Sequence, residues 1–149
     1  SPTAQFYRSA GAVLWLQRGT DYGEVAYFKN YGGTNVGHID VAASSTAYVT
    51  SSDYRLKENI ASMTGALAKV AALKPCTYTW KATGEQADGF IAHELGEVCP
   101  HAVYGEKDAV NEDGSIKAQG IDTSFLVATL TAAIQELTAR VAQLEAKGA

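Results

Sequence analysis

Ser52 and Lys57 carry the residue types of a serine nucleophile and its base, five residues apart along the chain. A serine hydroxyl attacks a carbonyl only when a base takes its proton, and a lysine can be that base only while neutral. A free lysine has a pKa near 10.4, so having it neutral near pH 7.4 costs roughly 4 kcal/mol, unless burial lowers the pKa by several units. We therefore expect Lys57 to serve Ser52 only where folding or assembly removes it from water.

The spacing of the two residues sets a further condition on the backbone. In a straight strand they would lie about 16 Å apart, and in a helix they would lie about 140° apart around the axis. Neither element brings them into contact, so the pair needs a turn between them or a lysine from a neighbouring chain. Taken alone, the segment Ser52–Lys57 is more typical of a polar N-cap before a helix.

Other chemistry is poorly supported by the residue spacing. His38, His93 and His101 lack the spacing of metal ligands, and Cys99 with His101 makes only one short pair, so we expect no zinc site. The glycines form no phosphate-binding loop. We therefore expect no metal and no cofactor.

Composition excludes several classes of function. The 149 residues carry a net charge of -4, which argues against binding to a phosphate backbone. No apolar run approaches the roughly 18 residues of a membrane span, and residues 1–5 do not read as a signal peptide. Starting at Ser1 rather than Met suggests a fragment of a longer protein. Cys76 and Cys99 do not make a disulfide framework, which favours a reducing compartment.

The first 51 residues are patterned as strands separated by turns rich in glycine. Because so short a segment buries little apolar surface, it makes a poor independent core, and its bare strand edges need partners. We expect an intertwined oligomer, with a small monomeric β-meander as the alternative. The expected strands are residues 12–18, 24–29, 35–41 and 46–50.

The remainder of the chain mixes helices and short strands. An amphipathic helix is expected over 58–73, stopped before Pro75, because apolar residues recur there every three or four positions. The other expected elements are a strand over 76–81, a loop over 82–88, a strand over 89–92, a helix over 93–98, and a hairpin pairing 103–104 with 115–118 around the turn 111–114.

A heptad pattern dominates the C-terminal helix, expected over about residues 123–147. Residues 122–124 offer an N-cap and Gly148 follows the last turn. The residue types at the core positions favour a two-stranded coiled coil, although three heptads are too few to decide the number of helices. The alternative is a helix packed on its own domain. The seam consists of Val127, Leu130, Ile134, Leu137, Val141 and Leu144.

Three segments together resemble a known family. They are Ser52-Asp53-Tyr54-Arg55-Leu56-Lys57-Glu58-Asn59-Ile60, the stretch 73–81, and Gly89-Phe90-Ile91-Ala92-His93-Glu94-Leu95, followed by the heptad helix. In this order they resemble the intramolecular chaperone domain at the C-terminus of phage tail spikes and fibres, including endosialidases. The resemblance covers about residues 52–149. His93 departs from the glutamine frequent in the family, which leaves the role of that position open.

The resemblance implies a self-cleaving chaperone with a serine–lysine dyad. Ser52 corresponds to the family's nucleophile and Lys57 to its partner, so the bond to be cut is Ser51–Ser52. The family implies a homotrimer, which outranks the two-strand preference of the heptads. Asp53, Arg55 and Asn59 also match the motif, and we expect positioning roles for them.

The expected fold class is α+β. A β-rich end of a phage fibre or spike (1–51) precedes a small mixed α/β chaperone domain with a coiled-coil helix (52–149), in an intertwined homotrimer. The partners are then the same chain's upstream strands and two further copies. The fibre part would remain on the virion tail, and the released domain would act in the host cytoplasm. The alternatives are a trimerisation module that does not cleave, and a fibre tip whose Tyr22, Tyr27 or Tyr31 bind a host receptor.

Overall fold

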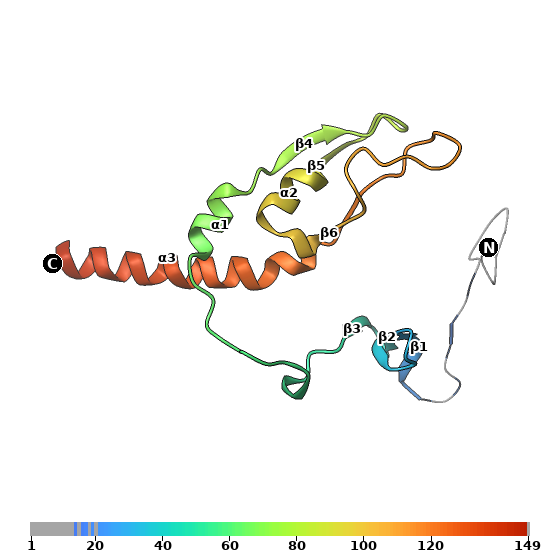
Figure 1. Ribbon diagram of the computed structural model, residues 1–149. Coiled ribbons are helices and arrows are strands. Elements are labelled where there is room, and N and C mark those ends of the chain that lie inside the picture. Colours follow the sequence, from blue (N-terminus) through green and yellow to red (C-terminus); the bar gives the residue numbers. More distant parts are fainter. Residues whose placement is uncertain (1–13, 15, 18, 20, 149) are drawn as a thin grey trace. The chain divides into compact units, whose positions relative to one another are not determined.

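The computed structural model describes residues 14, 16, 17, 19 and 21–148, and the chain divides into two compact units, Ser1–Ile60 and Ala61–Ala149. Figure 1 labels the elements of each unit. The boundary between the two units falls after Ile60, so residues 52–60 belong to the first unit. The strand expected over 12–18 lies mostly outside the described residues.

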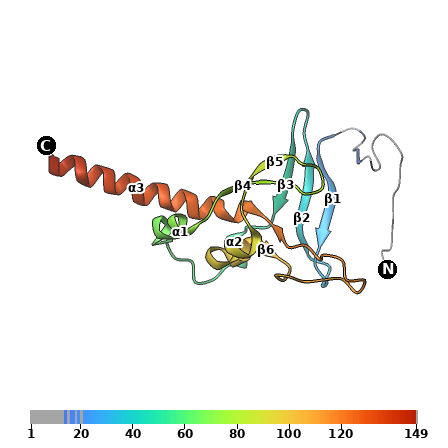
Figure 2. The same ribbon diagram turned by 90° about the horizontal axis from the view of Figure 1, so that it is seen from above.

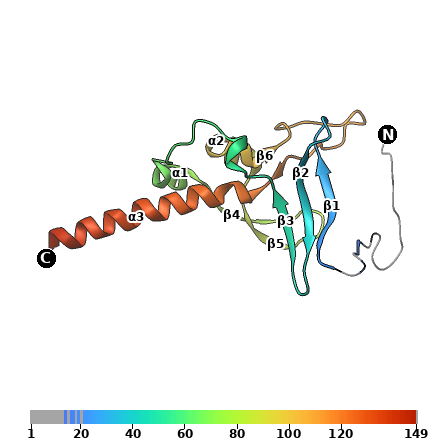
Figure 3. The same ribbon diagram turned by 90° about the horizontal axis from the view of Figure 1, so that it is seen from below.

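The first unit contains a three-stranded antiparallel sheet. Its strands are β1 (Gly23–Lys29), β2 (Asn35–Val41) and β3 (Thr46–Thr50), with β2 in the middle, as Figures 2 and 3 show. In the β1–β2 turn, the Asn30 side chain accepts a hydrogen bond from the Thr34 N–H at 3.0 Å, and Gly33 adopts a φ of 79°. These strands confirm three of the expected ones.

The sheet has no covering layer among the described residues of its unit. Gly37 is its one buried position, and all of β3 is exposed. Tyr27 and Tyr48 remain 53% and 82% exposed. The expectation that this segment makes a poor core of its own is therefore confirmed for the described part of the unit.

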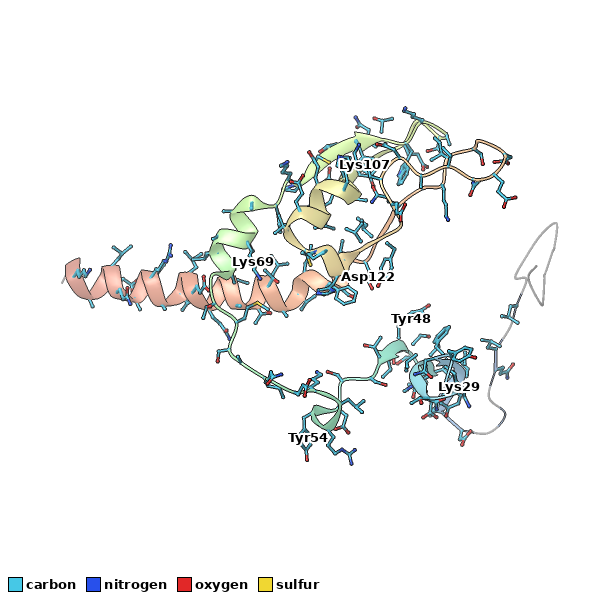
Figure 4. All side chains as sticks on the ribbon, in the orientation of Figure 1. Lys29, Tyr48, Tyr54, Lys69, Lys107 and Asp122 are labelled. Carbon is cyan, nitrogen blue, oxygen red and sulfur yellow. The ribbon has the colours of Figure 1, made fainter. Side chains whose placement is uncertain are left out.

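The helix expected over 58–73 is wrong in its first half. The helix α1 spans only Ala66–Ala72, and a short 3-10 helix, η1 (Tyr54–Leu56), precedes an irregular stretch. Asn59 and Gly65 adopt left-handed φ values of 52° and 70°, which no continuous helix accepts. Figure 4 shows Tyr54 on η1.

A hairpin and a short helix follow α1 in the second unit. The hairpin pairs β4 (Cys76–Thr79) with β5 (Gln86–Gly89), and the helix α2 spans Ala92–Val98. The strand expected over 76–81 ends early because Trp80 enters the turn, where its carbonyl accepts the Gly84 N–H at 2.8 Å. The strand expected over 89–92 is wrong beyond Gly89. Most of the pairing residues, 86–88, lie in the expected loop, and Phe90 packs on the core instead.

The pairing expected between 103–104 and 115–118 is wrong as well. The strand β6 (Val103–Tyr104) pairs with β7 (Gly120–Ile121), and the Asp122 N–H extends this ladder to the Ala102 carbonyl at 2.8 Å. The turn at 111–114 is confirmed: the Gly114 N–H donates to the Asn111 carbonyl at 2.9 Å. The turn closes a small loop of its own through the bridge between Val110 and Ile116, so β6 pairs with a segment further along the chain.

The C-terminal helix is confirmed. A 3-10 turn, η3 (Thr123–Phe125), leads into α3 (Leu126–Gly148), and the Asp122 carboxylate caps the turn by accepting the Ser124 N–H at 2.9 Å. Two small core clusters anchor the first half of α3. One joins Leu126 to Leu95 and Ala102; the other joins Ala132 and Ala133 to Ala66 of α1. The mixed helices and strands agree with the expected α+β class.

The heptad seam of α3 stays largely exposed among the described residues. Its six side chains are 41–68% exposed, whereas Ala132 and Ala133, off the seam, are buried against α1. The second half of α3 projects beyond the other elements of its unit in all three views (Figures 1 to 3). By length and composition alone, residues Thr123–Gly148 would also suffice to cross a membrane. The heptad spacing of the exposed side chains favours partner helices instead.

Candidate active site

Ser52 and Lys57 lie in contact within one chain. The Lys57 Nζ donates a hydrogen bond to the Ser52 Oγ at 2.7 Å. The turn η1 makes this approach: the Leu56 N–H donates to the Asp53 carbonyl and the Lys57 N–H to the Tyr54 carbonyl, both at 3.1 Å. The turn required by the spacing is therefore present, and it brings a hydroxyl and an amine together at a distance that would allow proton transfer.

Asp53 and Arg55 hold the turn that carries this contact. The Asp53 carboxylate caps η1 by accepting the Arg55 N–H at 2.8 Å, and it also binds the Arg55 guanidinium through Nε at 3.0 Å and Nη2 at 2.6 Å. The Arg55 side chain is the larger cause, and its backbone N–H the smaller one, of the lowered pKa of Asp53. This charged contact with the forked guanidinium keeps the Asp53 carboxylate, which caps the turn, ionised.

Asn59 lies just beyond the turn, with a positive φ of 52°. Asparagine tolerates this left-handed conformation better than most residues. Asp53, Arg55 and Asn59 thus each shape the backbone around the pair, and the positioning roles expected for them stay a prediction.

The peptide bond between Ser51 and Ser52 joins the sheet to this turn. The Ser51 N–H donates to the Val36 carbonyl at 3.1 Å, one step beyond the pair Gly37–Thr50 that ends the β2–β3 register. The Ser51 side of the bond is therefore held by the sheet, and the Ser52 side is held through the contact of its hydroxyl with Lys57.

The Ser52 and Lys57 side chains are both exposed in the single chain. No side chain of the turn itself is buried either. Among the described residues, the hydroxyl and the amine of the candidate site are therefore open to water.

Glu136 caps the helix α1, and the sequence did not indicate this role. Its two carboxylate oxygens accept the Ala66 and Leu67 N–H groups at the start of α1, each at 2.9 Å. The bond from Leu67 is the largest cause, and that from Ala66 the next, of the lowered pKa of Glu136. Because Gly65 supplies no side-chain cap, α1 takes its cap from α3, 70 residues away. No local motif could have revealed it.

Two other groups of side chains are brought together by the fold. His93, whose role was left open, lines a groove with Trp80 and Ile121. On the sheet, Glu24, His38 and Asp40 place potential metal-ligating atoms within 4.8 Å of one another. Cross-strand register creates this cluster, which the linear spacing of the histidines did not show. Glu24 also takes part in a further interaction, so we assign the cluster no ion.

Comparison with protein families identifies the segment that begins at the candidate nucleophile. Residues 52–104 match a peptidase family described as "Chaperone of endosialidase". The resemblance is thereby confirmed: this segment is an intramolecular chaperone domain of the endosialidase type. The family's name and description indicate a chaperone role, a peptidase-type domain and the context of phage tail fibres. A comparison with curated proteins found no match.

Proposed function

We propose that this protein is a self-cleaving intramolecular chaperone that trimerises and folds a phage tail fibre or spike, then releases itself at the Ser51–Ser52 bond. The observation that carries the proposal is the 2.7 Å contact between the Ser52 Oγ and the Lys57 Nζ. This contact lies at the first residue of the segment that matches the chaperone family.

The proposed reaction proceeds through an ester. Neutral Lys57 takes the Ser52 hydroxyl proton while the Oγ attacks the Ser51 carbonyl carbon. The carbon–nitrogen bond then breaks, the proton passes to the Ser52 nitrogen, and Ser51 is left esterified to the Ser52 Oγ. Water hydrolyses the ester, which leaves a carboxylate on Ser51 and restores the Ser52 hydroxyl. This chemistry needs no metal or cofactor.

Assembly would supply the condition under which Lys57 acts. A lysine becomes a base when it is taken out of water, and both side chains of the pair are exposed in the single chain. The surface that covers them would therefore come from neighbouring chains. The site would stay inactive in an unassembled chain and act after the trimer forms.

The α3 seam supplies the surface for trimerisation. Its six apolar side chains stay exposed at heptad spacing, while α1 covers other positions of the helix. Two further copies of α3 would bury this seam. Three helices joined in this way hold the upstream strands of three chains at high local concentration.

The first unit fits the end of the fibre that such a trimer would fold. Its sheet lacks a covering layer among the described residues, and β1 and β3 are edge strands. Pairing between chains is slow and prone to slip in register, which a chaperone that aligns three chains would correct. Residues 1–51 would remain on the virion tail, and the cut domain would be left in the host cytoplasm.

Denaturing mass spectrometry of the assembled full chain tests the proposal. Wild type should yield two fragments that meet between Ser51 and Ser52. Ser52→Ala and Lys57→Ala should remain whole, and Ser51→Ala, which keeps the nucleophile, should still be cut. A wild-type chain that stays whole after assembly would leave a trimerisation module as the better account. Glycan or receptor binding that survives removal of 52–149 would instead favour the fibre tip.

A further inference from the structure

The last hydrogen bonds of the β2–β3 ladder lead to the bond that is proposed to break. Gly37 pairs with Thr50, and the next bond runs from the Ser51 N–H to the Val36 carbonyl at 3.1 Å. The chain then leaves the sheet for η1, where the hydroxyl of Ser52 meets Lys57. The peptide bond between Ser51 and Ser52 therefore lies between the last hydrogen bond of the sheet and the contact of Ser52 with Lys57.

Gly37 allows the close approach of these two strands. A Cβ atom on Gly37 would lie 2.6 Å from the Val49 carbonyl oxygen, a backbone atom that no side-chain movement can shift. Its φ is not among the positive ones of the chain, so the backbone conformation itself does not call for glycine. Glycine weakens the interior of a central strand, where a residue with a side chain to pack is favoured. The close contact with β3 explains why glycine stands here.

We propose that Gly37 and the Val36 carbonyl are positioning elements for self-cleavage. They hold the end of β3 against β2, and this holds the Ser51 carbonyl in one orientation toward the Ser52 hydroxyl. When the strands are unpaired, the carbonyl turns freely and the reacting atoms lose their alignment. The inference rests on the proposed function and deepens it, because cleavage at the same site then depends on the pairing of the upstream strands.

The rate of self-cleavage gives the first test. Gly37→Ala would be compared with Gly32→Ala in the turn between β1 and β2, where the added Cβ would meet the Asn30 Oδ1 at 3.5 Å. Both chains would be refolded and sampled over time by denaturing mass spectrometry. Gly37→Ala should be cut about 10- to 10²-fold more slowly than wild type, because a small misplacement of reacting atoms costs that much. Gly32→Ala should be cut at the wild-type rate.

Hydrogen exchange separates a positioning role from a merely structural one. In an uncut Ser52→Ala background, Gly37→Ala should speed exchange of the Ser51 amide and leave the β1–β2 amides and the trimer mass unchanged. If Gly37→Ala is not recovered folded, Thr50→Gly loosens the same pair without a clash. It should also speed Ser51 exchange and slow the cleavage of a chain that retains Ser52.

Three results would overturn the inference. In the first, Gly37→Ala or Thr50→Gly is cut at the wild-type rate although the Ser51 amide exchanges faster. In the second, cleavage slows only together with loss of β1–β2 protection or of the trimer, which makes Gly37 a structural residue. In the third, assembled wild type is not cut, and the proposed function falls as well. The first two leave the proposed function standing.

Discussion

Replacing Leu137 with alanine removes from the middle of the α3 seam a side chain that is 52% exposed in the single chain. Full burial of a leucine is worth about 1.5–3 kcal/mol, so the half still exposed contributes about 1 kcal/mol when the seam closes. Three chains give about 3 kcal/mol per trimer, which corresponds to about a 10²-fold lower association constant. A cavity left between the helices would increase this loss.

Sedimentation equilibrium over a series of protein concentrations measures this effect. The chains would carry Ser52→Ala so that cleavage does not change the mass. Gln143→Ala is the control, because Gln143 is exposed on α3 but lies off the seam. It should assemble like its parent. An association constant that Leu137→Ala leaves unchanged would refute the reasoning and place the contacts between chains elsewhere.

Three further predictions concern the site and the contact between α1 and α3. Lys57→Arg keeps a cation near Ser52, but arginine cannot act as a base. Time courses by mass spectrometry should therefore show cleavage slower by about 10²- to 10⁴-fold. Cleavage at the wild-type rate would contradict the role of Lys57 as a base. Trimers refolded from mixed Ser52→Ala and Lys57→Ala chains should stay whole, because one chain supplies both groups of the contact; fragments would show that Lys57 acts between chains. The pKa of Glu136 is lower in the folded chain than the ordinary glutamate pKa of about 4.3. Its contribution to stability is therefore fully present at a pH above the ordinary pKa, and is lost as the pH falls through the pKa of the folded chain. Thermal unfolding should therefore show Glu136→Gln less stable than its parent at pH 7, with the gap closing in acid; a gap that widens in acid would contradict this sign.

Local patterns in the sequence predicted the elements that depend on neighbouring residues. The heptads of 127–144 predicted α3, and Asp122 predicted the cap that the structure shows. The condition that Ser52 and Lys57 need a turn between them was also met, because η1 is made and capped by residues of the motif itself. In these two cases the cause lay within a few residues, and the sequence was sufficient.

Elements set by distant residues could not be predicted in this way. The start of α1 depends on Glu136, 70 residues away, and on a left-handed Gly65 that apolar spacing does not reveal. The true partner of β6 follows a loop that closes on itself through Val110 and Ile116, so the nearest apolar segment was the wrong choice. The same limit applies to Gly37, whose importance appears only when β3 lies against it.

Trapping the proposed ester tests the central claim most directly. Assembled wild type would be treated with hydroxylamine, a nucleophile that attacks an ester far faster than an amide, and the fragments weighed by mass spectrometry. The account predicts faster cleavage and an N-terminal fragment that ends in a hydroxamate on Ser51, with nothing trapped in Ser52→Ala. A rate that hydroxylamine leaves unchanged, with Ser51 always ending as a carboxylate, would contradict attack by the Ser52 hydroxyl.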